Sequence, residues 1–489
     1  MTVSLPAPVL ERLGRAVGDR TGLHFPPERW ADLERGVRAL AVKAGHASAE
    51  ACAQSLLAEP PVHAEIEALA GELTVGETYF FREKRSFEVL AETVLPGMVR
   101  DGARTGRSLR LWSAGCCSGE EAYSLAILLD RFFPDAAARR GTVLGTDLNP
   151  AFLRKARDGV FSEWSFRDAP PWLKPEYFRR TEDRLYEILP RLRERVTFGS
   201  LNLAGEGYPA LANGTNAMDL ILCRNVLMYF TPQKAAQVVE HFHRCLVEGG
   251  MLIVSPTEIS SQLFASFTAV EYQHVIFYRK DAKPAATLEI AAPAPSPAPA
   301  RAASGRVASK VPVARSVAKP APPKPGRFEQ ALDLFGRGDY ASAAEMLQTD
   351  PAFPAAARDA ALLARICANL GRLDEARDWV ETALGLDKLD AGLHFLRALI
   401  LQEQGAAGEA EAALKRTLYL DPRLVLAHMA LGNHALRQGR AGEAAHHFAN
   451  VLALLADYQS GDILPQSDGL PAGKLKEMVT SAMSQEQSA

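Results

Sequence analysis

Residues 109–126 of the chain read Leu-Arg-Leu-Trp-Ser-Ala-Gly-Cys-Cys-Ser-Gly-Glu-Glu-Ala-Tyr-Ser-Leu-Ala. The first six residues alternate in the way of a short strand, Gly115 and Gly119 allow a sharp turn, and the apolar residues that follow predict a helix. A strand, a tight turn and a helix form the first unit of an α/β sheet. In such sheets a ligand binds beyond the carboxyl end of the strand, beside the free N–H groups at the start of the helix.

Two acidic residues open this predicted helix and change the ligand that we expect there. Glu120 and Glu121 repel a pyrophosphate but attract a cationic group, such as an ammonium or a sulfonium. The loop also lacks the G-x-G-x-x-G pattern and the P-loop lysine, which disfavours a dinucleotide or a nucleoside triphosphate. S-adenosylmethionine fits the stretch better. The alternative is an ordinary strand–helix turn with a pair of helix-capping glutamates.

Composition limits the class of protein. A chain of 489 residues suggests about three domains, and 55 basic against 58 acidic residues give a net charge of −3, so nothing indicates a nucleic-acid partner. No apolar run approaches the roughly 20 residues of a membrane span, and no signal peptide precedes the first helix, so we expect a cytoplasmic protein that is not membrane-embedded. The scattered cysteines include no C-x-x-C pair, so we expect reduced thiols and no metal site; the adjacent Cys116 and Cys117 leave an oxidant sensor as the alternative.

The pattern changes along the chain and divides it into five parts. Residues 1–90 show helical periodicity only and predict a small helical domain. Strands and helices then alternate, so residues 91–280 are expected to form a parallel, doubly wound sheet. Residues 281–326 are rich in Ala, Pro and Ser and predict a disordered linker. Residues 327–458 form repeats, and residues 459–489 are expected to be a flexible tail.

Polar side chains follow the ends of the predicted strands or open the helix after them. These residues are Glu121, Asp147, Asn202, Arg224 and Asn225. Because the carboxyl ends of parallel strands meet at one edge of a sheet, these side chains are expected to surround a common crevice. An acid that ends the second strand, as Asp147 does, suits hydrogen bonding to ribose hydroxyls.

The C-terminal part repeats with a fixed period. Gly371, Gly405 and Gly439 are 34 residues apart (405 − 371 and 439 − 405), which is the period of tetratricopeptide helix pairs. Stacked pairs form an all-α solenoid whose groove holds peptides or partner helices and performs no chemistry. His394 and His428 follow the same register, so they are interpreted as packing or groove residues rather than metal ligands.

Five stretches carry a resemblance to a known family. They are Leu73–Glu83 (Leu-Thr-Val-Gly-Glu-Thr-Tyr-Phe-Phe-Arg-Glu), Leu111–Ser124, Gly145–Asn149, Ser200–Leu203 and Leu222–Phe230. Together they resemble the CheR-type chemoreceptor glutamate methyltransferases, in the form that carries a C-terminal tetratricopeptide array. The resemblance spans residues 1–280 in order and implies a class I, Rossmann-like methyltransferase domain behind an N-terminal helical bundle.

The resemblance implies O-methylation of glutamate side chains on the cytoplasmic coiled coil of a chemoreceptor, which adjusts signalling adaptation, while the array binds protein partners. It implies S-adenosylmethionine as the cofactor, held by Thr78, Arg82, Glu121, Asp147, Asn202, Leu203, Arg224 and Asn225. Arg82 and Tyr229 are the implied catalytic residues, on either side of the reacting methyl and the substrate carboxylate. Because an exposed glutamate is already ionised at neutral pH, the reaction needs no general base and consists mainly of positioning.

Two departures from the family pattern affect these expectations. Gly76 stands where family members often have Asn, two positions before Thr78. The segment between Phe178 and Val196 looks shorter than in members that grip a receptor pentapeptide on a small β-subdomain, so we predict that the array contributes to target choice instead. A cofactor-binding signalling scaffold without methyl transfer and a small-molecule methyltransferase are the competing interpretations.

Overall fold

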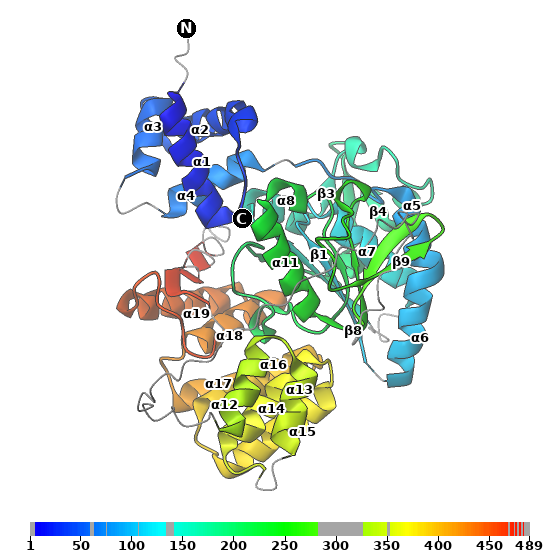
Figure 1. Cartoon of the computed structure of the whole chain (residues 1–489), viewed down its shortest axis with the longest axis vertical. Coiled ribbons are helices and arrows are strands. Elements are labelled where there is room, and N and C mark those ends of the chain that lie inside the picture. The colour runs from blue at the N-terminus through cyan, green and yellow to red at the C-terminus, as the bar shows by residue number, and fades with distance from the viewer. Residues whose placement is uncertain are drawn as a thin grey trace, which may run out of the picture.

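The computed structural model describes residues 5–58, 63–74, 76–105, 107–133, 141–281, 326–349 and 353–467, with a few residues beyond 469. Figure 1 shows an N-terminal helical domain, a sheet domain flanked by helices, and a C-terminal helical array below them. The predicted linker lies outside the described residues, apart from Asp281 and Gly326 at its two ends. Among the described residues, no helix is both long and apolar enough to cross a membrane.

Four helices form the N-terminal domain, as the periodicity predicts. They are α1 (Ala7–Thr21), α2 (Trp30–Ala44), α3 (Ala49–Leu56) and α4 (His63–Leu73). Leu13, Leu33 and Leu69 belong to their shared core, where each is at most 1% exposed. Helix α1 ends at Gly22, whose backbone is left-handed (φ 78°) and which lies against the sheet domain. The end of α1 therefore lies close to the carboxyl ends of the strands.

A seven-stranded sheet forms the centre of the next domain. Its strands are β1 (Leu109–Ala114), β2 (Gly141–Asp147), β6 (Val196–Ser200), β7 (Met218–Leu222), β8 (Leu246–Ile253), β9 (Thr268–Tyr272) and β10 (Val275–Arg279), in the order β6-β2-β1-β7-β8-β10-β9. The first five in this order are parallel, and β10 pairs antiparallel with β8 and β9. This confirms the predicted doubly wound sheet, to which β10 and β9 add an antiparallel pair at one edge. The order reverses between β1 and β7, where a ligand crevice is expected.

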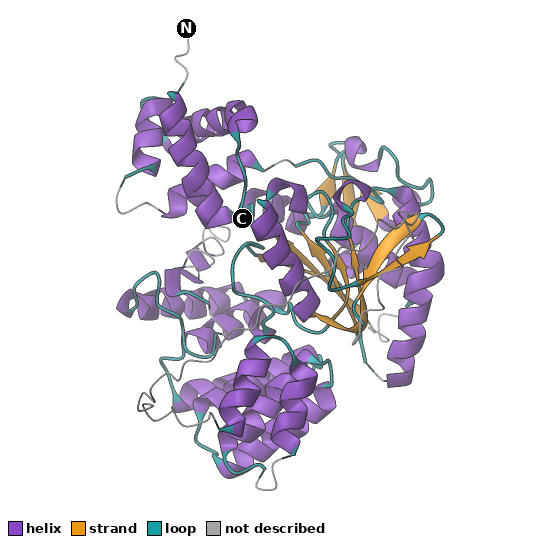
Figure 2. Cartoon of the chain, in the orientation of Figure 1, coloured by secondary structure: helices purple, strands orange, loops and turns teal. Residues whose placement is uncertain are grey.

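Helices cover both faces of the sheet (Figure 2). They are α5 (Lys84–Val89), the π-helical turn Leu90–Val94, α6 (Leu95–Thr105), α7 (Glu120–Phe132), α8 (Pro150–Asp158) and α11 (Pro232–Cys245). Each face of the sheet has its own hydrophobic core, and successive residues of β1 belong to different cores. Leu111 belongs to the core that includes α7, and Trp112 belongs to the core that includes Phe242 of α11. The alternation in residues 109–114 thus marks a strand buried on both faces.

A second, small sheet follows α8. It contains β3 (Val160–Phe161), β4 (Phe178–Arg180) and β5 (Tyr186–Ile188) in the antiparallel order β3-β5-β4. In sequence, α9 (Leu173–Tyr177) lies between β3 and β4, and α10 (Pro190–Arg193) follows β5. The segment between Phe178 and Val196 is short, as noted from the sequence, and the role of the array in target choice stays a prediction. Residues 181–185 join β4 to β5 directly, so a small sheet forms although the segment is short.

The C-terminal array consists of helix pairs, as the 34-residue period predicts. Its helices are α12 (Arg327–Gly336), α13 (Tyr340–Gln348), α14 (Ala357–Asn369), α15 (Leu373–Leu386), α16 (Ala391–Glu403), α17 (Ala407–Leu420), α18 (Val425–Arg437) and α19 (Ala441–Leu454). Each pair turns at a left-handed glycine, with φ between 71° and 78° at Gly338, Gly371, Gly405 and Gly439. Only glycine adopts this backbone without strain, which explains the spacing.

The described residues after Tyr458 include some that pack against the array, whereas the sequence predicts a flexible tail. Leu464 and Leu475 are at most 2% exposed and belong to the core of the array. The segment is mostly polar, so the sequence pattern did not reveal these few apolar contacts.

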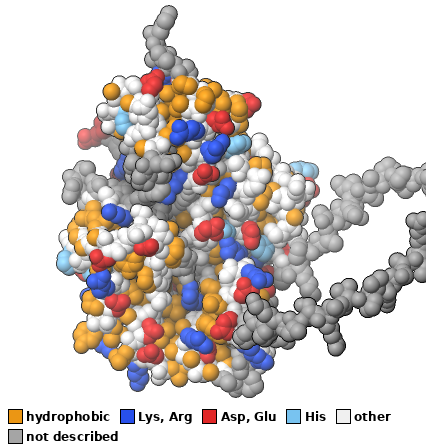
Figure 3. Space-filling view, turned by 60° about the vertical axis from the view of Figure 1, so that its left-hand side comes forward, with side chains coloured by type: hydrophobic (Ala, Val, Ile, Leu, Met, Phe, Trp, Pro, Cys, Tyr) orange, Lys and Arg blue, Asp and Glu red, His pale blue; other side chains and the backbone are white. Residues whose placement is uncertain are grey.

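On the face drawn in Figure 3, Lys and Arg side chains are interspersed with Asp and Glu, in keeping with the nearly balanced composition.

Candidate active site

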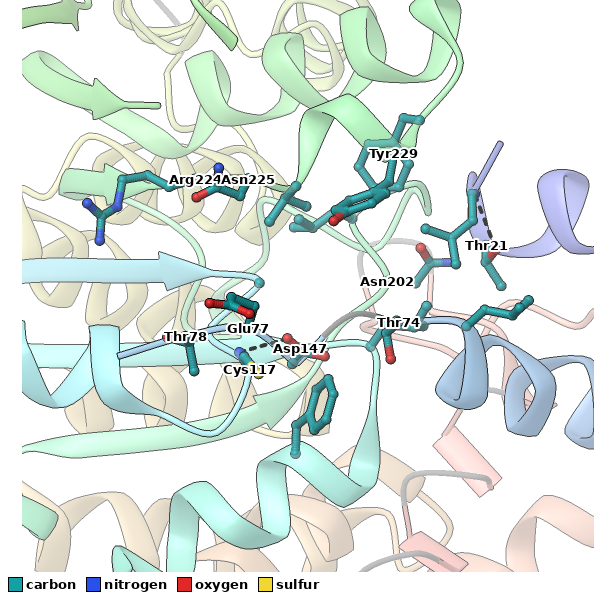
Figure 4. A pocket seen from close by; sticks show the side chains of 18 of the residues that line it. Thr21, Thr74, Glu77, Thr78, Cys117, Asp147, Asn202, Arg224, Asn225 and Tyr229 are labelled. Atoms are coloured by element: carbon teal, nitrogen blue, oxygen red, sulfur yellow. Dashed lines mark hydrogen bonds between the residues drawn. The ribbon is translucent and has the colours of Figure 1, made fainter. Parts of the chain in front are cut away.

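A pocket of about 1000 Å³, its open mouth included, lies at the carboxyl ends of β1, β2, β6 and β7. All the residues predicted from the sequence line it: Thr78, Arg82, Glu121, Asp147, Asn202, Leu203, Arg224, Asn225 and Tyr229. Figure 4 shows Asn225 and Tyr229 on one side of the cavity and Thr78 and Asp147 on the other. Segments far apart in the sequence therefore meet at the point where the strand order reverses.

The loop after β1 is held by the acid that ends β2. Asp147 accepts hydrogen bonds from the backbone N–H of Cys117 through Oδ2 (2.9 Å) and of Asn149 through Oδ1 (2.8 Å). Burial raises the pKa of Asp147, and these hydrogen bonds oppose the rise. A carboxylate has about four lone-pair sites, so Asp147 keeps acceptor capacity for hydroxyl groups in the pocket. Gly115 (φ 82°) has no room for a side chain, because a Cβ there would lie 2.5 Å from Cγ2 of Val226.

Glu121 and Arg224 form a buried brace at the centre of the site. Ser113 donates a 2.6 Å hydrogen bond to Oε1 of Glu121, and Nε of Arg224 donates a 2.7 Å bond to Oε2. The Arg224 side chain is 2% exposed, and its Nη1 also donates to the backbone carbonyl of Arg82 at 2.6 Å. Since each charge has a partner, the desolvation that burial imposes is compensated. Arg224 thus joins the ends of β1 and β7 to the segment that carries Arg82.

The backbone is strained on both sides of Arg82. Phe81 (φ 58°) and Glu83 (φ 60°) are both left-handed, which is an uncommon conformation for residues other than glycine. Nη1 of Arg82 donates a 2.6 Å hydrogen bond to the carbonyl of Glu77, and the backbone N–H of Phe81 donates to Oγ of Ser124 at 3.0 Å. Such strain persists only where the surroundings over-determine it, and it concentrates at functional sites.

Glu258 is a site residue that the sequence analysis missed. Its Oε2 accepts from the backbone N–H of Asn225 (2.8 Å), and its Oε1 accepts from those of Val226 (2.8 Å) and Met228 (3.2 Å). Oε2 also accepts from Ser255, from Oγ at 2.8 Å and from the backbone N–H at 3.2 Å. One buried carboxylate therefore holds the loop that leads to Tyr229. The sequence contains its signal, because Ser255-Pro-Thr-Glu258 is a capping box that follows directly on β8.

The loop that Glu258 holds presents a free acceptor to the pocket. Asn225 is left-handed (φ 58°), and its buried Oδ1 has no hydrogen-bond partner among the described residues. A buried acceptor without a partner is costly, so a ligand that supplies a donor at this point gains affinity.

The N-terminal domain closes one side of the pocket. The backbone N–H of His24 donates to the carbonyl of Tyr229 (2.8 Å), and Nδ2 of Asn202 donates to the carbonyl of Arg20 (2.8 Å). The guanidinium carbon of Arg29 lies 5.3 Å from the centre of the Tyr229 ring. The sequence gives no signal for these contacts, because they depend on how two separate cores are placed against each other.

Gly76 is exposed but lies against an aromatic ring. A Cβ at Gly76 would lie 2.8 Å from Cζ of Phe152, which also lines the pocket. The aromatic ring therefore occupies the space that a side chain at position 76 would need.

Cys116 and Cys117, in the loop after β1, are buried and disfavour the reactive thiolate form. Burial raises the pKa of Cys117 to about 12 and that of Cys116 well above its usual value. Because the thiolate is the reactive form, this environment does not suit an oxidant sensor.

Comparison with known proteins agrees with this geometry. A family model described as "CheR methyltransferase, SAM binding domain" matches residues 76–276. The chain is 34% identical over 219 residues to Chemotaxis protein methyltransferase 2 of Vibrio cholerae, a match that covers 45% of this chain and 74% of the relative. It is 32% identical over 217 residues to Chemotaxis protein methyltransferase 1 of Pseudomonas aeruginosa, covering 44% of this chain and 77% of that protein. A crystal structure of MamA overlaps 27% of this chain and 77% of its own, at 18% identity and a TM-score of 0.26.

The fold and this pocket define an S-adenosylmethionine-dependent methyltransferase. The chain belongs to the CheR methyltransferase family, whose members among these relatives are named for chemotaxis. Its C-terminal tetratricopeptide array lies outside the matched family domain, residues 76–276.

The pocket fits the cofactor of this family. The unpaired Oδ1 of Asn225 and the carboxylate of Glu121 suit the ammonium group of a methionine moiety. The remaining lone pairs of Asp147 suit ribose hydroxyls, and Leu203 and Phe230 add apolar lining.

Proposed function

We propose that this enzyme methylates glutamate side chains on the cytoplasmic coiled coil of a chemoreceptor and so adjusts adaptation in a chemotaxis-type signalling pathway. The observation that carries the proposal is that Arg82 and Tyr229 line the same pocket as Glu121, Asp147 and Asn225, the residues suited to the cofactor. The names of the relatives, which are chemotaxis protein methyltransferases, support the same reaction class. Because the proposed substrate is the cytoplasmic part of a receptor, the proposal includes a cytoplasmic location for the enzyme.

The proposal assigns a role to each lining residue. Thr78, Glu121, Asp147, Asn202, Leu203 and Asn225 hold the cofactor directly. Arg224 acts mainly through Glu121 and through the carbonyl of Arg82, to which it is already bonded. When bound, S-adenosylmethionine supplies an electrophilic methyl group on a sulfonium.

Arg82 and Tyr229 orient the substrate. A glutamate carboxylate has an ordinary pKa near 4.3, so it arrives ionised and this chain has no proton to remove. The guanidinium of Arg82 keeps donors beyond the one that Glu77 accepts, and these suit a carboxylate oxygen. The Tyr229 hydroxyl can donate a second hydrogen bond, while the bonded carbonyl of Tyr229 keeps its residue in place. Together they aim one oxygen at the methyl group, and the closed side of the pocket excludes water.

The tetratricopeptide array is proposed to bind a protein partner and to contribute to target choice. A groove between stacked helix pairs suits a peptide or a helix, and it adds no chemistry. Removal of residues 327–489 is therefore expected to change targets while the affinity for the cofactor stays the same.

The test is transfer of a labelled methyl group from S-adenosylmethionine to the cytoplasmic fragment of a receptor from the same genome. Carboxyl methyl esters are scored as base-labile, volatile methanol. Arg82→Ala and Tyr229→Phe are expected to lose most of the signal. Their controls are Arg85→Ala, which removes an exposed arginine paired with Glu88, and Tyr419→Phe, a tyrosine that is 76% exposed on the array.

The outcomes separate the competing functions. Base-labile label that depends on Arg82 and Tyr229 supports glutamate methylation by this pocket. Cofactor binding by calorimetry without label on any receptor refutes it in favour of a signalling scaffold. Label on a small acceptor alone refutes it in favour of a small-molecule methyltransferase.

A further inference from the structure

The array and the sheet domain share a buried contact at the end of the sheet opposite the pocket. Figure 1 places α16 directly beneath the sheet domain. At this contact Nη1 of Arg110, the second residue of β1, forms an ion pair with Oε2 of Glu403, the last residue of α16. The two side chains are 14% and 11% exposed. An ion pair this buried, between segments almost 300 residues apart in sequence (403 − 110 = 293), is not a chance surface contact.

The rest of the Arg110 guanidinium is fixed by the sheet domain. Its Nη2 donates to the carbonyl of Gly214 (2.8 Å), and its Nε donates to the carbonyl of Asn216 (3.2 Å). The backbone N–H of Arg110 donates to Oδ2 of Asp219 (2.8 Å). Burial lowers the pKa of Arg110 to about 10, so the group is still cationic at neutral pH. The sheet domain thus presents one oriented cation to which Glu403 is complementary.

Two further contacts use earlier helices of the array. Nδ2 of Asn216 donates to the carbonyl of Ala368 at the end of α14 (3.3 Å), and Nη1 of Arg244 donates to the carbonyl of Gly336 at the end of α12 (3.2 Å). Leu211, from the loop before β7, is buried in the core of the array. The contact therefore spans the ends of α12, α14 and α16, the first helices of three successive pairs.

The glycines at the turns of the helix pairs differ in whether they contact the sheet domain. A Cβ at Gly338 would lie 2.4 Å from Cγ of Arg244, and one at Gly371 would lie 3.2 Å from Cδ of Arg107. Nothing lies within 4 Å of a Cβ at Gly405 or Gly439. The turns at Gly338 and Gly371 therefore pack against the sheet domain. The turns at Gly405 and Gly439 have the same left-handed backbone but no neighbour at this position.

We infer that the amino-terminal edge of the methyltransferase sheet is a docking surface for the chain's own tetratricopeptide array. The composition of residues 281–326 predicts two modules that move freely on a tether, but charge complementarity, burial and the packed turns join the modules into one body. The array then has a fixed orientation, because the ends of α12, α14 and α16 hold it against the sheet domain. A partner in its groove is consequently carried at a constant orientation to the pocket, which stays uncovered at the opposite end of the strands.

The first test is a distance measurement on the full-length chain, which needs no disruptive variant. Spin labels are attached at His274, whose side chain is 97% exposed on the sheet domain, and at Tyr419, 76% exposed on the array, after replacement of each by cysteine. The native cysteines among the described residues are buried, so they compete little for the label. A single narrow distance distribution is expected. A broad distribution, with the reach of a flexible tether, would overturn the inference.

The second test identifies the contact. Glu403→Arg places a like charge against Arg110, and hydrogen exchange of residues 211–218 is expected to become about tenfold faster or more, because a docked segment opens only when its cover leaves. The matched control is Glu409→Arg, at an exposed ion pair with Arg377 on the same array. Exchange in α14 and α17 reports whether the array itself is still folded. Equal exchange of residues 211–218 in the wild type and in folded Glu403→Arg would overturn the inference.

Discussion

Glu258 offers the sharpest test of how the active-site loop is held. Glu258→Gln keeps the size of the side chain and removes its charge and one of its two acceptor oxygens. If the amide oxygen takes the place of Oε2, the N–H groups of Val226 and Met228 face an NH₂ group; if it takes the place of Oε1, those of Asn225 and Ser255 do. In either orientation two backbone donors lose their acceptor.

The size of the effect follows from these two bonds. A hydrogen bond to a charged group contributes about 1.5–3 kcal/mol, so the loss of two lowers the free energy of unfolding by about 3 kcal/mol at the lower end. Part of this loss is expected to appear as local opening of residues 225–229, of which Asn225, Val226 and Tyr229 line the pocket. When only a fraction of molecules keep the competent loop, the apparent affinity falls by that fraction. The dissociation constant for S-adenosylmethionine is expected to rise about tenfold or more.

The measurements are isothermal titration of S-adenosylmethionine and urea unfolding of the same preparations. Glu271→Gln is the matched control, because this glutamate on β9 is 65% exposed and pairs with the exposed His274 at 3.5 Å. An exposed pair contributes less than about 1 kcal/mol, so the control is expected to match the wild type in both assays. Wild-type affinity together with a wild-type urea midpoint in Glu258→Gln would refute the idea that this carboxylate positions the loop.

Three further predictions concern single sites. Gly76→Asn is expected to weaken cofactor binding and to destabilise by about 1–3 kcal/mol through the ring of Phe152, with recovery in the double variant that also carries Phe152→Ala; calorimetry that shows no loss would contradict it. Cys117, with its pKa raised to about 12, is expected to react with iodoacetamide at pH 8 about a thousandfold slower than a free thiol of pKa near 8.5, as followed by mass spectrometry of the native protein. Burial lowers the pKa of His243 to about 4, below the 6.5 of the unfolded chain, so its stability contribution is present above pH 6.5 and is lost as the pH falls toward 4. The urea midpoint of His243→Asn is therefore expected to fall less between pH 7 and pH 4.5 than that of the wild type, and equal slopes would argue against this assignment.

The sheet and its pocket were predictable because they obey local rules. The run from Leu220 to Cys223 is apolar because β7 is buried on both faces, and the polar residues Arg224 and Asn225 follow at once after the strand. Parallel strands bring such ends together whatever the details of packing. Pattern alone therefore placed residues from four strands in one pocket.

The remaining features depend on contacts that no local pattern encodes. Strands β3, β4 and β5 have two or three residues each, too few to show an alternation. Arg110 looks in the sequence like the solvent side of a half-exposed strand, and it is buried only because Gly214, Asn216 and Glu403 surround it from distant segments. The hydrogen bond from His24 to Tyr229 depends likewise on the meeting of two separate cores.

The acids of the pocket show why a methyl transfer of this type suits the site. Asp147 holds the loop after β1, Glu121 holds Arg224, and Glu258 holds the loop after β7, so three carboxylates at neighbouring strand ends are engaged in fixing the backbone. A reaction that had to remove a proton would need one of them as a base, free of such bonds and close to the substrate. A glutamate nucleophile arrives already ionised, so the enzyme can use its acids for rigidity and leave orientation to neutral or cationic groups. Arg82 and Tyr229 are of that kind, and the left-handed backbone of Phe81 and Glu83 shows that the fold holds the residues on either side of Arg82 in an unfavourable conformation, at the place where orientation matters most.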